Sequence, residues 1–280
     1  MAPGAYRGRL APSPSGYLHL GHARTFWIAH ERARSHGGTL VFRKEDLDPA
    51  RSKPAFAQAM IEDLRWLGLS WQEGPDIGGP FAPYTQSQRL DHYRKAFDQL
   101  RQSSVLFPCT CSRKDVLRAL QAPHQGDEEP LYPGTCREKS VDHPPANANW
   151  RFRVSDGQAI EFLDGFFGQQ CFIAGRDFGD FVVWRNDGIP SYQLAVVLDD
   201  AAMQITEVVR GADLLLSTAR QLLLYRALGL QPPAFFHCPL LTHSNGTRLA
   251  KRHDALSLRT LRSQGATPEE LQNQFVLPEP

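Results

Sequence analysis

The sequence has no apolar run long enough to cross a lipid bilayer, and its N-terminus lacks the pattern of a signal peptide. We therefore expect a cytoplasmic protein with no membrane partner. Cysteine is scarce as well. The chain has five cysteines, an odd number, which argues against a disulfide framework and favours reduced thiols or metal ligands.

A marked excess of charge of either sign is also absent, because 31 basic and 30 acidic side chains leave a formal net charge of +1. Overall charge therefore does not indicate a nucleic-acid partner, although a protein with this net charge can still have a local basic face. Lysine is rare, and nearly all of the basic residues are arginines. With 280 residues, 41% of them hydrophobic, the chain can form one sizeable core, or a core with an inserted subdomain.

Residues 9–24 combine the end of a short strand, a turn and the start of a helix. The apolar strand predicted over residues 6–11 runs into a turn rich in proline and glycine, which neither a strand nor a helix can continue. After Gly21 the apolar residues follow a helical period. His19 and His22 therefore lie at a helix N-terminus, where free N–H groups, the helix dipole and two imidazoles favour phosphate. Two surface or capping histidines are the alternative for such a pair taken alone.

Two charged residues follow predicted strands. Glu45 comes after an apolar segment, and a carboxylate at the carboxyl end of a parallel strand can meet an ammonium group. Arg210 comes after the strand predicted over residues 205–209, where a guanidinium can hold a carboxylate through two parallel hydrogen bonds. Solvated loop charges are the alternative for both. Further along, Thr218 and Gln221 have the spacing of a capping box at the start of a helix.

From about residue 106 to residue 184 the helical period disappears. Short strand-like segments alternate there with Asp-Gly turns, which predicts an inserted, strand-rich subdomain between two halves of a nucleotide-binding fold. We therefore predict an α/β protein with a Rossmann-like, doubly wound parallel sheet and this subdomain inserted. The expected divisions are a first half over 1–105, the strand-rich insert over 106–187, a second half over 188–245 and C-terminal helices over 246–280.

The predicted insert contains three of the cysteines, in a C-x-C pair with a third further along. This spacing suits one zinc ion shared by thiolates, with unbonded thiols as the alternative. The thiols are Cys109, Cys111 and Cys136. The spacing leaves the fourth ligand open among Tyr132, His124, Asp127, Glu128 and His143. The two remaining cysteines, Cys171 and Cys238, lie in apolar segments and are expected to be buried.

Several of these motifs resemble one family. Residues 11–16, APSPSG, followed by HLGH at 19–22, resemble the HIGH motif of class I aminoacyl-tRNA synthetases in its glutamyl and glutaminyl form. Residues 43–48, RKEDLD, are similar to the R-I-E-D-T-D segment of that branch, and residues 84–89, YTQSQR, to its Y-x-Q-S-x-R run. Residues 248–252, RLAKR, resemble the KMSKS loop, with an arginine and an alanine in place of its first lysine and first serine.

The cysteine pattern C-x-C…Y-x-x-x-C and an ending soon after the KMSKS-like motif narrow the resemblance to the glutamyl-queuosine tRNA(Asp) synthetases. That family lacks the anticodon-binding domain of a full glutamyl-tRNA synthetase. The resemblance implies a monomeric ligase that uses ATP and Mg²⁺ to activate L-glutamate as glutamyl-adenylate. The glutamate is then transferred to queuosine at the wobble position of tRNA(Asp).

Three other functions stay open at this point. One is a truncated glutamyl-tRNA synthetase that charges the tRNA 3′ end. A second is a non-catalytic regulatory paralogue that binds RNA or an amino acid, which the alanine at position 250 keeps open. The third is a nucleotidyltransferase of the same superfamily that makes a small-molecule adenylate.

The resemblance also implies roles for single residues. The catalytic residues would be His19, His22 and Lys251, which together with Gly21 would bind ATP. Glu45 would contact the amino group of glutamate. The complete set expected around glutamate is Arg9, Leu10, Ala11, Pro12, Ser13, Glu45, Tyr192 and Arg210. Zn²⁺ would be held by Cys109, Cys111, Tyr132 and Cys136.

Overall fold

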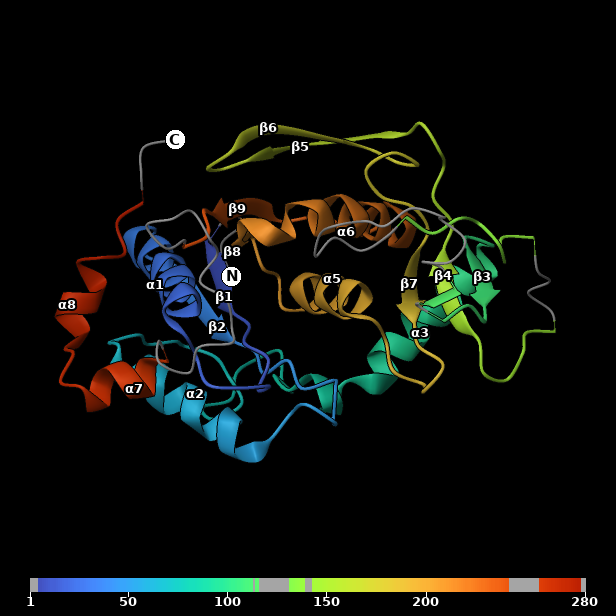
Figure 1. The fold of residues 1–280 in the computed structure, drawn as a ribbon. Helices are drawn as coiled ribbons and strands as arrows, with labels where there is room; N and C mark the ends of the chain where they lie inside the picture. The colour runs from blue at the N-terminus through green and yellow to red at the C-terminus, as the bar shows by residue number, and fades with distance from the viewer. Residues whose placement is uncertain (1–4, 113, 116–130, 139–142, 242–256, 278–280) are drawn as a thin grey trace.

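The computed structural model describes residues 5–112, 114–115, 131–138, 143–241 and 257–277. The described residues form a mixed α/β structure in which the strands of the central region run parallel (Figure 1). This is the predicted fold class. None of the described helices is long and apolar enough to cross a membrane.

The first part of the chain is a β-α-β unit. Strand β1 (Arg7–Leu10) leads through the proline-rich turn to α1 (Leu20–Ser35), and β2 (Thr39–Phe42) returns to pair with β1 in parallel. The chain leaves α1 at Gly37, whose φ of +58° lies in the left-handed region that glycine adopts without strain. Helices α2 (Pro54–Trp66) and α3 (Leu90–Gln102) follow, with the short η1 (Gln86–Gln88) between them.

The second half contributes two more parallel strands beside the first pair. Helix α5 (Tyr192–Ala202) precedes β8 (Glu207–Gly211), and after η2 (Ala212–Leu214) and α6 (Leu215–Leu228) the strand β9 (Ala234–Cys238) pairs with β8. Strand β8 lies next to β1, where the Thr206 N–H donates to the Arg7 carbonyl at 2.9 Å. The carboxyl ends of β1, β2, β8 and β9 therefore share one edge, where ligands bind in open α/β sheets.

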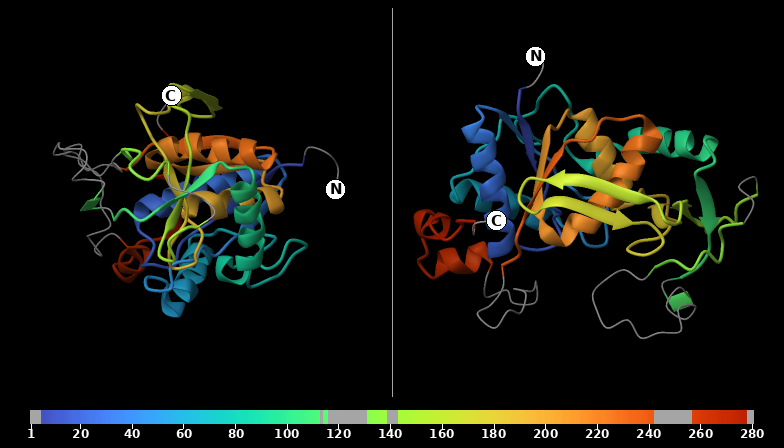
Figure 2. Two further views of the ribbon diagram at one scale, coloured as in Figure 1. Left: turned by 90° about the vertical axis from the view of Figure 1, so that its right-hand side faces the viewer. Right: turned by 90° about the horizontal axis from the view of Figure 1, so that it is seen from above.

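The strand-rich segment predicted between the halves is present, and its strands divide into two groups. Strands β3 (Leu106–Cys109), β4 (Asn149–Phe152) and β7 (Phe181–Trp184) form an antiparallel sheet at the end of the molecule away from α1 (Figure 1). The hairpin of β5 (Ala159–Asp164) and β6 (Gly168–Ile173) instead extends over α6 towards the central strands (Figure 2). There β5 pairs with β9, Asp164 lying opposite Phe235.

The described residues form three apolar clusters, two of them large. One packs α1 and α2 against the first strands and also takes in the C-terminal helices α7 (Leu258–Ser263) and α8 (Pro268–Gln272). The other fills the space between α3, α5, α6 and the antiparallel sheet. The largest fully buried apolar and aromatic side chains include Tyr84, Tyr93, Tyr225, Phe42, Phe107 and Phe178.

Two local expectations were wrong. Helix α6 begins at Leu215, so Thr218 and Gln221 are buried inside the helix instead of capping it. The Thr218 hydroxyl lies 3.3 Å from the Leu214 carbonyl and also bonds to side chains outside the helix, a tertiary use that local spacing does not reveal. Cys171 is exposed on β6, whereas Cys238 is buried as expected.

Candidate active site

The two histidines of the proline-rich turn lie together at the start of α1. His19 is the N-cap of the helix, and its Nδ1 accepts the Gly21 N–H at 3.1 Å. The imidazoles of His19 and His22 stack with their centroids 3.7 Å apart. Because Nδ1 of His19 is an acceptor, the neutral ring carries its proton on Nε2, which is then the donor. The pair can thus supply hydrogen bonds at the positive end of a helix.

The turn is also joined to the segment that precedes α7. His19 forms a β-bridge with Ser257, and the Leu258 N–H donates to the Leu18 carbonyl at 2.8 Å. The KMSKS-like residues 248–252, including Lys251, lie outside the described residues. The chain is described again from Ser257, which lies at the turn that contains His19 and His22.

A cluster of ionisable side chains lies near the carboxyl ends of the parallel strands; we call it the charged cluster. Its members are Arg9 on β1, Arg43 and Glu45 after β2, Tyr192, Asp199 and Asp200 on α5, and Arg210 on β8. All of them except Tyr192 are buried. Burial of so many charges is costly unless each is paired. Groups in the cluster that lack a partner therefore indicate which charges a ligand would supply.

Arg43 is the centre of the charged cluster. Its guanidinium is fully buried and donates from Nη1 to Asp200 Oδ1 at 2.7 Å and from Nη2 to Glu45 Oε1 at 3.0 Å. Glu45 is also fixed through its backbone, because its N–H donates to the Pro12 carbonyl at 3.1 Å. Burial raises the pKa of Glu45, and the charges of Arg43 and Arg9 oppose that rise. A ligand ammonium group beside Glu45 would favour its ionised form further.

Two other guanidiniums of the cluster keep an N–H without an acceptor among the described residues. Arg9 donates from Nη1 to the Val209 carbonyl at 2.7 Å, while its Nε has no hydrogen-bond partner and lies 3.7 Å from Asp200 Oδ1. Arg210 uses Nε and Nη2, and its Nη1 has no partner. Burial lowers the pKa of Arg9, with Asp200 opposing and the cations Arg43 and Arg210 adding to the decrease. An anion with two carboxylates would satisfy both groups.

Tyr192 lies beside these guanidiniums at the first position of α5. Its phenol interacts electrostatically with Arg210, Glu45 and Arg9. The residue keeps 38% of its surface exposed, so it lies where solvent reaches the charged cluster. The structure thus brings together four of the residues predicted around glutamate.

The remaining predicted glutamate residues belong to the turn after β1. The Leu10 side chain is fully buried in the core, and its carbonyl accepts the Arg43 N–H at 2.8 Å. Pro12 is buried, Ala11 is half-buried and Ser13 is exposed. Backbone contacts from this turn therefore set the position of the segment from Arg43 to Glu45.

The residues that hold the charged cluster together were not predicted from the sequence. The Y-x-Q-S-x-R run has a clear structural role, because Gln86 Nε2 and Arg89 Nε donate to Asp199 at 2.8 and 2.7 Å. Arg43 connects Glu45 to Asp200, which makes it as central as Glu45 itself. One signal for these partners was present in the sequence. Asp199 and Asp200 are adjacent acids in a mostly apolar segment, and buried acids require charged or hydrogen-bonding partners.

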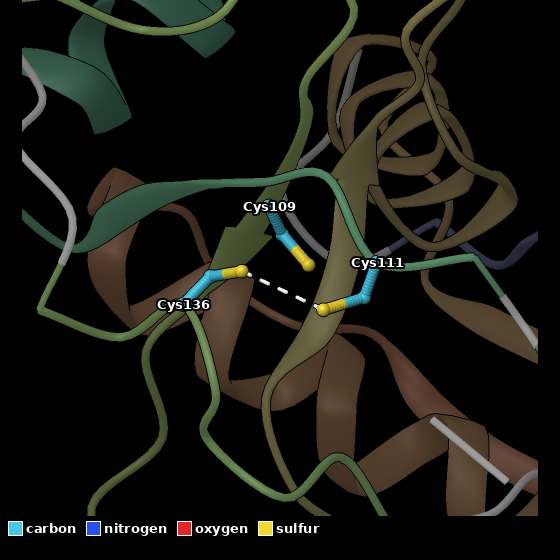
Figure 3. Close-up of side chains that lie close together, drawn as sticks. All are labelled: Cys109, Cys111 and Cys136. Carbon is cyan, nitrogen blue, oxygen red and sulfur yellow. Dashed lines mark hydrogen bonds between the residues drawn. The ribbon is translucent and has the colours of Figure 1, made fainter. Parts of the chain in front are cut away.

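The three cysteines of the strand-rich segment converge as expected (Figure 3). Their sulfur atoms lie within 4.8 Å of one another, and Sγ of Cys111 and Cys136 are 3.5 Å apart. The Tyr132 phenol oxygen joins them, 3.3 Å from Cys109 Sγ and 3.8 Å from Cys111 Sγ. Among the described residues no histidine or carboxylate belongs to this group, which leaves out His143. The other three candidate ligands, His124, Asp127 and Glu128, lie outside the described residues.

The protonation of these groups bears on metal binding. Burial and the neighbouring thiols raise the pKa of Cys111, and burial together with Cys109 and Cys136 raises that of the Tyr132 phenol. Cys111 and Tyr132 therefore favour their protonated forms unless a cation replaces the protons. The donor set, three sulfurs and one oxygen, fits a zinc ion.

Known proteins that are similar to this chain support the interpretation of this site as that of a synthetase. The model of the family described as tRNA synthetases class I (E and Q), catalytic domain, matches residues 5–278. A glutamyl-Q tRNA(Asp) synthetase of Symbiobacterium thermophilum is 51% identical over 94% of this chain and 83% of its own length. One of Nitratidesulfovibrio vulgaris is 49% identical over 92% of this chain and 82% of its own.

Among solved structures, a glutamate tRNA ligase from Elizabethkingia meningosepticum in complex with its amino acid superimposes with a TM-score of 0.76 at 30% identity. The match covers 93% of this chain and 53% of that one. The motifs, the fold and the similarity over more than nine tenths of this chain indicate the same family. The chain therefore belongs to the class I tRNA synthetases of the E and Q type and, within them, to the glutamyl-Q tRNA(Asp) synthetase family.

Proposed function

We propose that the protein activates L-glutamate with ATP and transfers the glutamate to queuosine at the wobble position of tRNA(Asp). Two buried arginines, Arg9 and Arg210, lie in one cluster with Glu45, and each keeps an N–H without a hydrogen-bond partner among the described residues. This observation carries the amino-acid part of the proposal. Glutamate has the complementary set of charges: two carboxylates for the guanidiniums and one ammonium group for Glu45. We call this arrangement the glutamate site.

The first step forms glutamyl-adenylate. An oxygen of the glutamate α-carboxylate bonds to the α-phosphorus of ATP, and the bond to pyrophosphate breaks. His19, His22 and Lys251 stabilise the charge that moves onto the phosphate oxygens. The bridge between His19 and Ser257, six residues after Lys251, supports a place for that lysine near the phosphates. Mg²⁺ would come with the nucleotide, because it is usually held by substrate phosphates and few protein groups, and would neutralise phosphate charge.

The second step transfers the acyl group. A hydroxyl of the queuosine cyclopentene diol attacks the activated carbonyl, and AMP leaves. We assign this step to positioning of the two reactants rather than to a general base. Discrimination against glutamine would follow from the charge requirement, because a neutral amide leaves a buried guanidinium without a counter-charge.

Transfer of labelled glutamate to tRNA tests which group of the tRNA accepts it. The protein is incubated with ATP and labelled glutamate, together with tRNA from strains that make or lack queuosine. We expect labelling only with the queuosine-containing tRNA. Labelling that persists without queuosine would instead support charging of the tRNA 3′ end.

Exchange of labelled pyrophosphate into ATP tests the activation step. We expect exchange that depends on glutamate and that Lys251→Ala abolishes. Absence of exchange in the wild type would support a regulatory paralogue, and exchange driven by another small acid would support a different adenylate-forming enzyme. We also propose that the protein is a cytoplasmic monomer; light scattering tests its oligomeric state.

We further propose that Cys109, Cys111, Cys136 and Tyr132 bind Zn²⁺, which would cross-link the end of β3 to the segment containing Tyr132. Metal analysis of the purified protein tests this. Cys109→Ser should lose most of the zinc, whereas Cys171→Ser should keep it, because Cys171 is exposed on β6 and outside the thiol group. Equal zinc in the two variants would contradict the site.

A further inference from the structure

A line of buried side chains connects the β5–β6 hairpin with Arg210. The carboxylate of Asp164, the last residue of β5, lies 2.6 Å from Nδ1 of His237 on β9. Nε2 of the same imidazole lies 3.1 Å from Nε of Arg210 on β8. Exposure is 2% for Asp164, 0% for His237 and 4% for Arg210, so water is not a competing partner.

The carboxylate fixes which imidazole nitrogen carries the proton. Asp164 accepts from the amides of Phe166 and Phe167 at 3.0 and 2.9 Å and from the His237 amide. Burial alone would raise its pKa, but the hydrogen bond from His237 and these amides hold the pKa of Asp164 below its ordinary value. Asp164 is therefore an acceptor only, and His237 donates from Nδ1. The lone pair on Nε2 then faces the Arg210 Nε–H.

The arginine is held at a second point as well. Its Nη2 donates to the Thr218 hydroxyl at 2.7 Å. With Nε and Nη2 both occupied, the planar guanidinium has one orientation, and Nη1 is left without a hydrogen-bond partner in the described part of the chain. An arginine left to rotate would lose side-chain entropy each time it bound a carboxylate.

We propose that Asp164 and His237 are positioning residues that orient Arg210 to receive a carboxylate of glutamate. The proposal rests on the glutamate site described above. Neither residue touches the amino acid; both act through Arg210. The hairpin of the strand-rich segment thereby completes the amino-acid site. A purely structural role, in which the Asp164–His237 contact only attaches the hairpin to β9, makes different predictions.

The decisive measurement is glutamate-dependent pyrophosphate exchange, with KM for glutamate, KM for ATP and kcat determined separately. Asp164→Asn replaces one carboxylate oxygen with an NH₂ group. In one orientation of the amide this group faces the N–H of the His237 ring, and in the other it faces the backbone N–H groups of the hairpin, so a donor meets a donor in both. His237→Leu removes the acceptor for Arg210 Nε, whereas His237→Gln can return an oxygen near the position of Nε2. We expect Asp164→Asn and His237→Leu to raise KM for glutamate about tenfold or more, with KM for ATP unchanged and His237→Gln closer to wild type.

Asp180→Asn is the matched control. Asp180 is 6% exposed and bonds to Arg137 and to the Val154 amide, so its replacement also disturbs a buried carboxylate with charged and backbone partners. It lies outside the charged cluster, and KM for glutamate should stay at the wild-type value. Discrimination between glutamate and glutamine should fall in Asp164→Asn and stay unchanged in Asp180→Asn.

The outcomes are distinguishable. No glutamate-dependent exchange in the wild type would overturn the proposed function itself. An active wild type with the same KM for glutamate in folded Asp164→Asn and His237→Leu would overturn the positioning role, as would equal changes in Asp164→Asn and Asp180→Asn. If His237→Leu does not fold, Thr218→Val and His237→Gln decide. Thr218→Val removes a hydroxyl that lies within hydrogen-bond distance of both Arg210 Nη2 and His237 Nε2. It should therefore raise KM for glutamate, and an unchanged KM there would overturn the proposal.

Discussion

Gly21 lies between His19 and His22, and a methyl group added at this position would contact the His19 ring. A Cβ at this position would lie 3.0 Å from Cε1 and 3.2 Å from Nδ1 of His19, so the imidazole would have to move. Gly21→Ala should therefore lower kcat of pyrophosphate exchange about tenfold, because it displaces a ring proposed to contact phosphate. Thermal stability should stay the same or rise, since alanine favours helix over glycine. An unchanged kcat in Gly21→Ala would show that the His19 ring position is not critical.

Tyr132 allows the fourth zinc ligand to be tested apart from the thiols. Tyr132→Phe keeps the buried ring and removes only the oxygen that lies 3.3 Å from Cys109 Sγ. We expect zinc affinity to fall by about 10- to 100-fold, the range typical of altered metal-site contacts. Competition with a chelator measures this. Wild-type affinity in Tyr132→Phe would assign the fourth position to another ligand.

At the level of elements, Glu207 attaches α1 to β8. Its carboxylate accepts from Nε and Nη2 of Arg32 at 2.7 Å each and from the Tyr6 hydroxyl at 2.7 Å. Burial alone would raise the pKa of Glu207, but the hydrogen bonds from Arg32 and Tyr6 hold it below its ordinary value. A carboxyl whose pKa is lowered by folding stabilises the protein above its unfolded pKa of about 4.3. That stability is lost as the pH falls through the folded pKa.

Glu207→Gln should therefore reduce the free energy of unfolding by about 2 kcal/mol at pH 7, because it weakens a partly buried ion pair. It should also flatten the fall in stability between about pH 5 and about pH 3. Urea denaturation over this pH range measures both. Parallel pH curves for wild type and variant would show that Glu207 does not contribute to the acid sensitivity.

The elements near the site could largely be predicted from the sequence, whereas their side-chain partners could not. The proline-rich turn and the helical period after Gly21 predicted the place of His19 and His22, because both signals are local. The predicted start of α6 was wrong because Thr218 does not cap the helix; its hydroxyl accepts a hydrogen bond from Arg210 on β8. His237 and Asp164 were missed for the same reason, since they are 73 residues apart in the sequence. The roles of single residues and the domain divisions stay predictions.

At the scale of the whole molecule, Asp199 joins the two halves of the fold. It accepts from Gln86, Arg89 and Tyr93, which precede it by 106 to 113 residues. Tyr93 is fully buried, and its hydroxyl lies 2.9 Å from Asp199 Oδ2. This contact belongs to both halves, so weakening it should destabilise them together.

Tyr93→Phe should accordingly lower the free energy of unfolding by about 1–2 kcal/mol, the effect of one hydrogen bond to a charged group. Unfolding followed by fluorescence and by circular dichroism should remain coincident. Tyr17→Phe is the control, because Tyr17 is 45% exposed, and its effect should stay within about 0.5 kcal/mol. Separate transitions for the two probes in Tyr93→Phe would show that the halves unfold independently.

The burial of arginines such as Arg7, Arg9, Arg43 and Arg210 sets how the molecule responds to ionic strength. Mobile ions screen charges at the surface but barely reach those inside, whereas contacts between a protein and RNA phosphates weaken steeply as salt is added. Added potassium chloride should therefore leave glutamate-dependent pyrophosphate exchange nearly intact while transfer to tRNA declines. The two halves of the proposed reaction can thus be observed one at a time by a change of buffer alone.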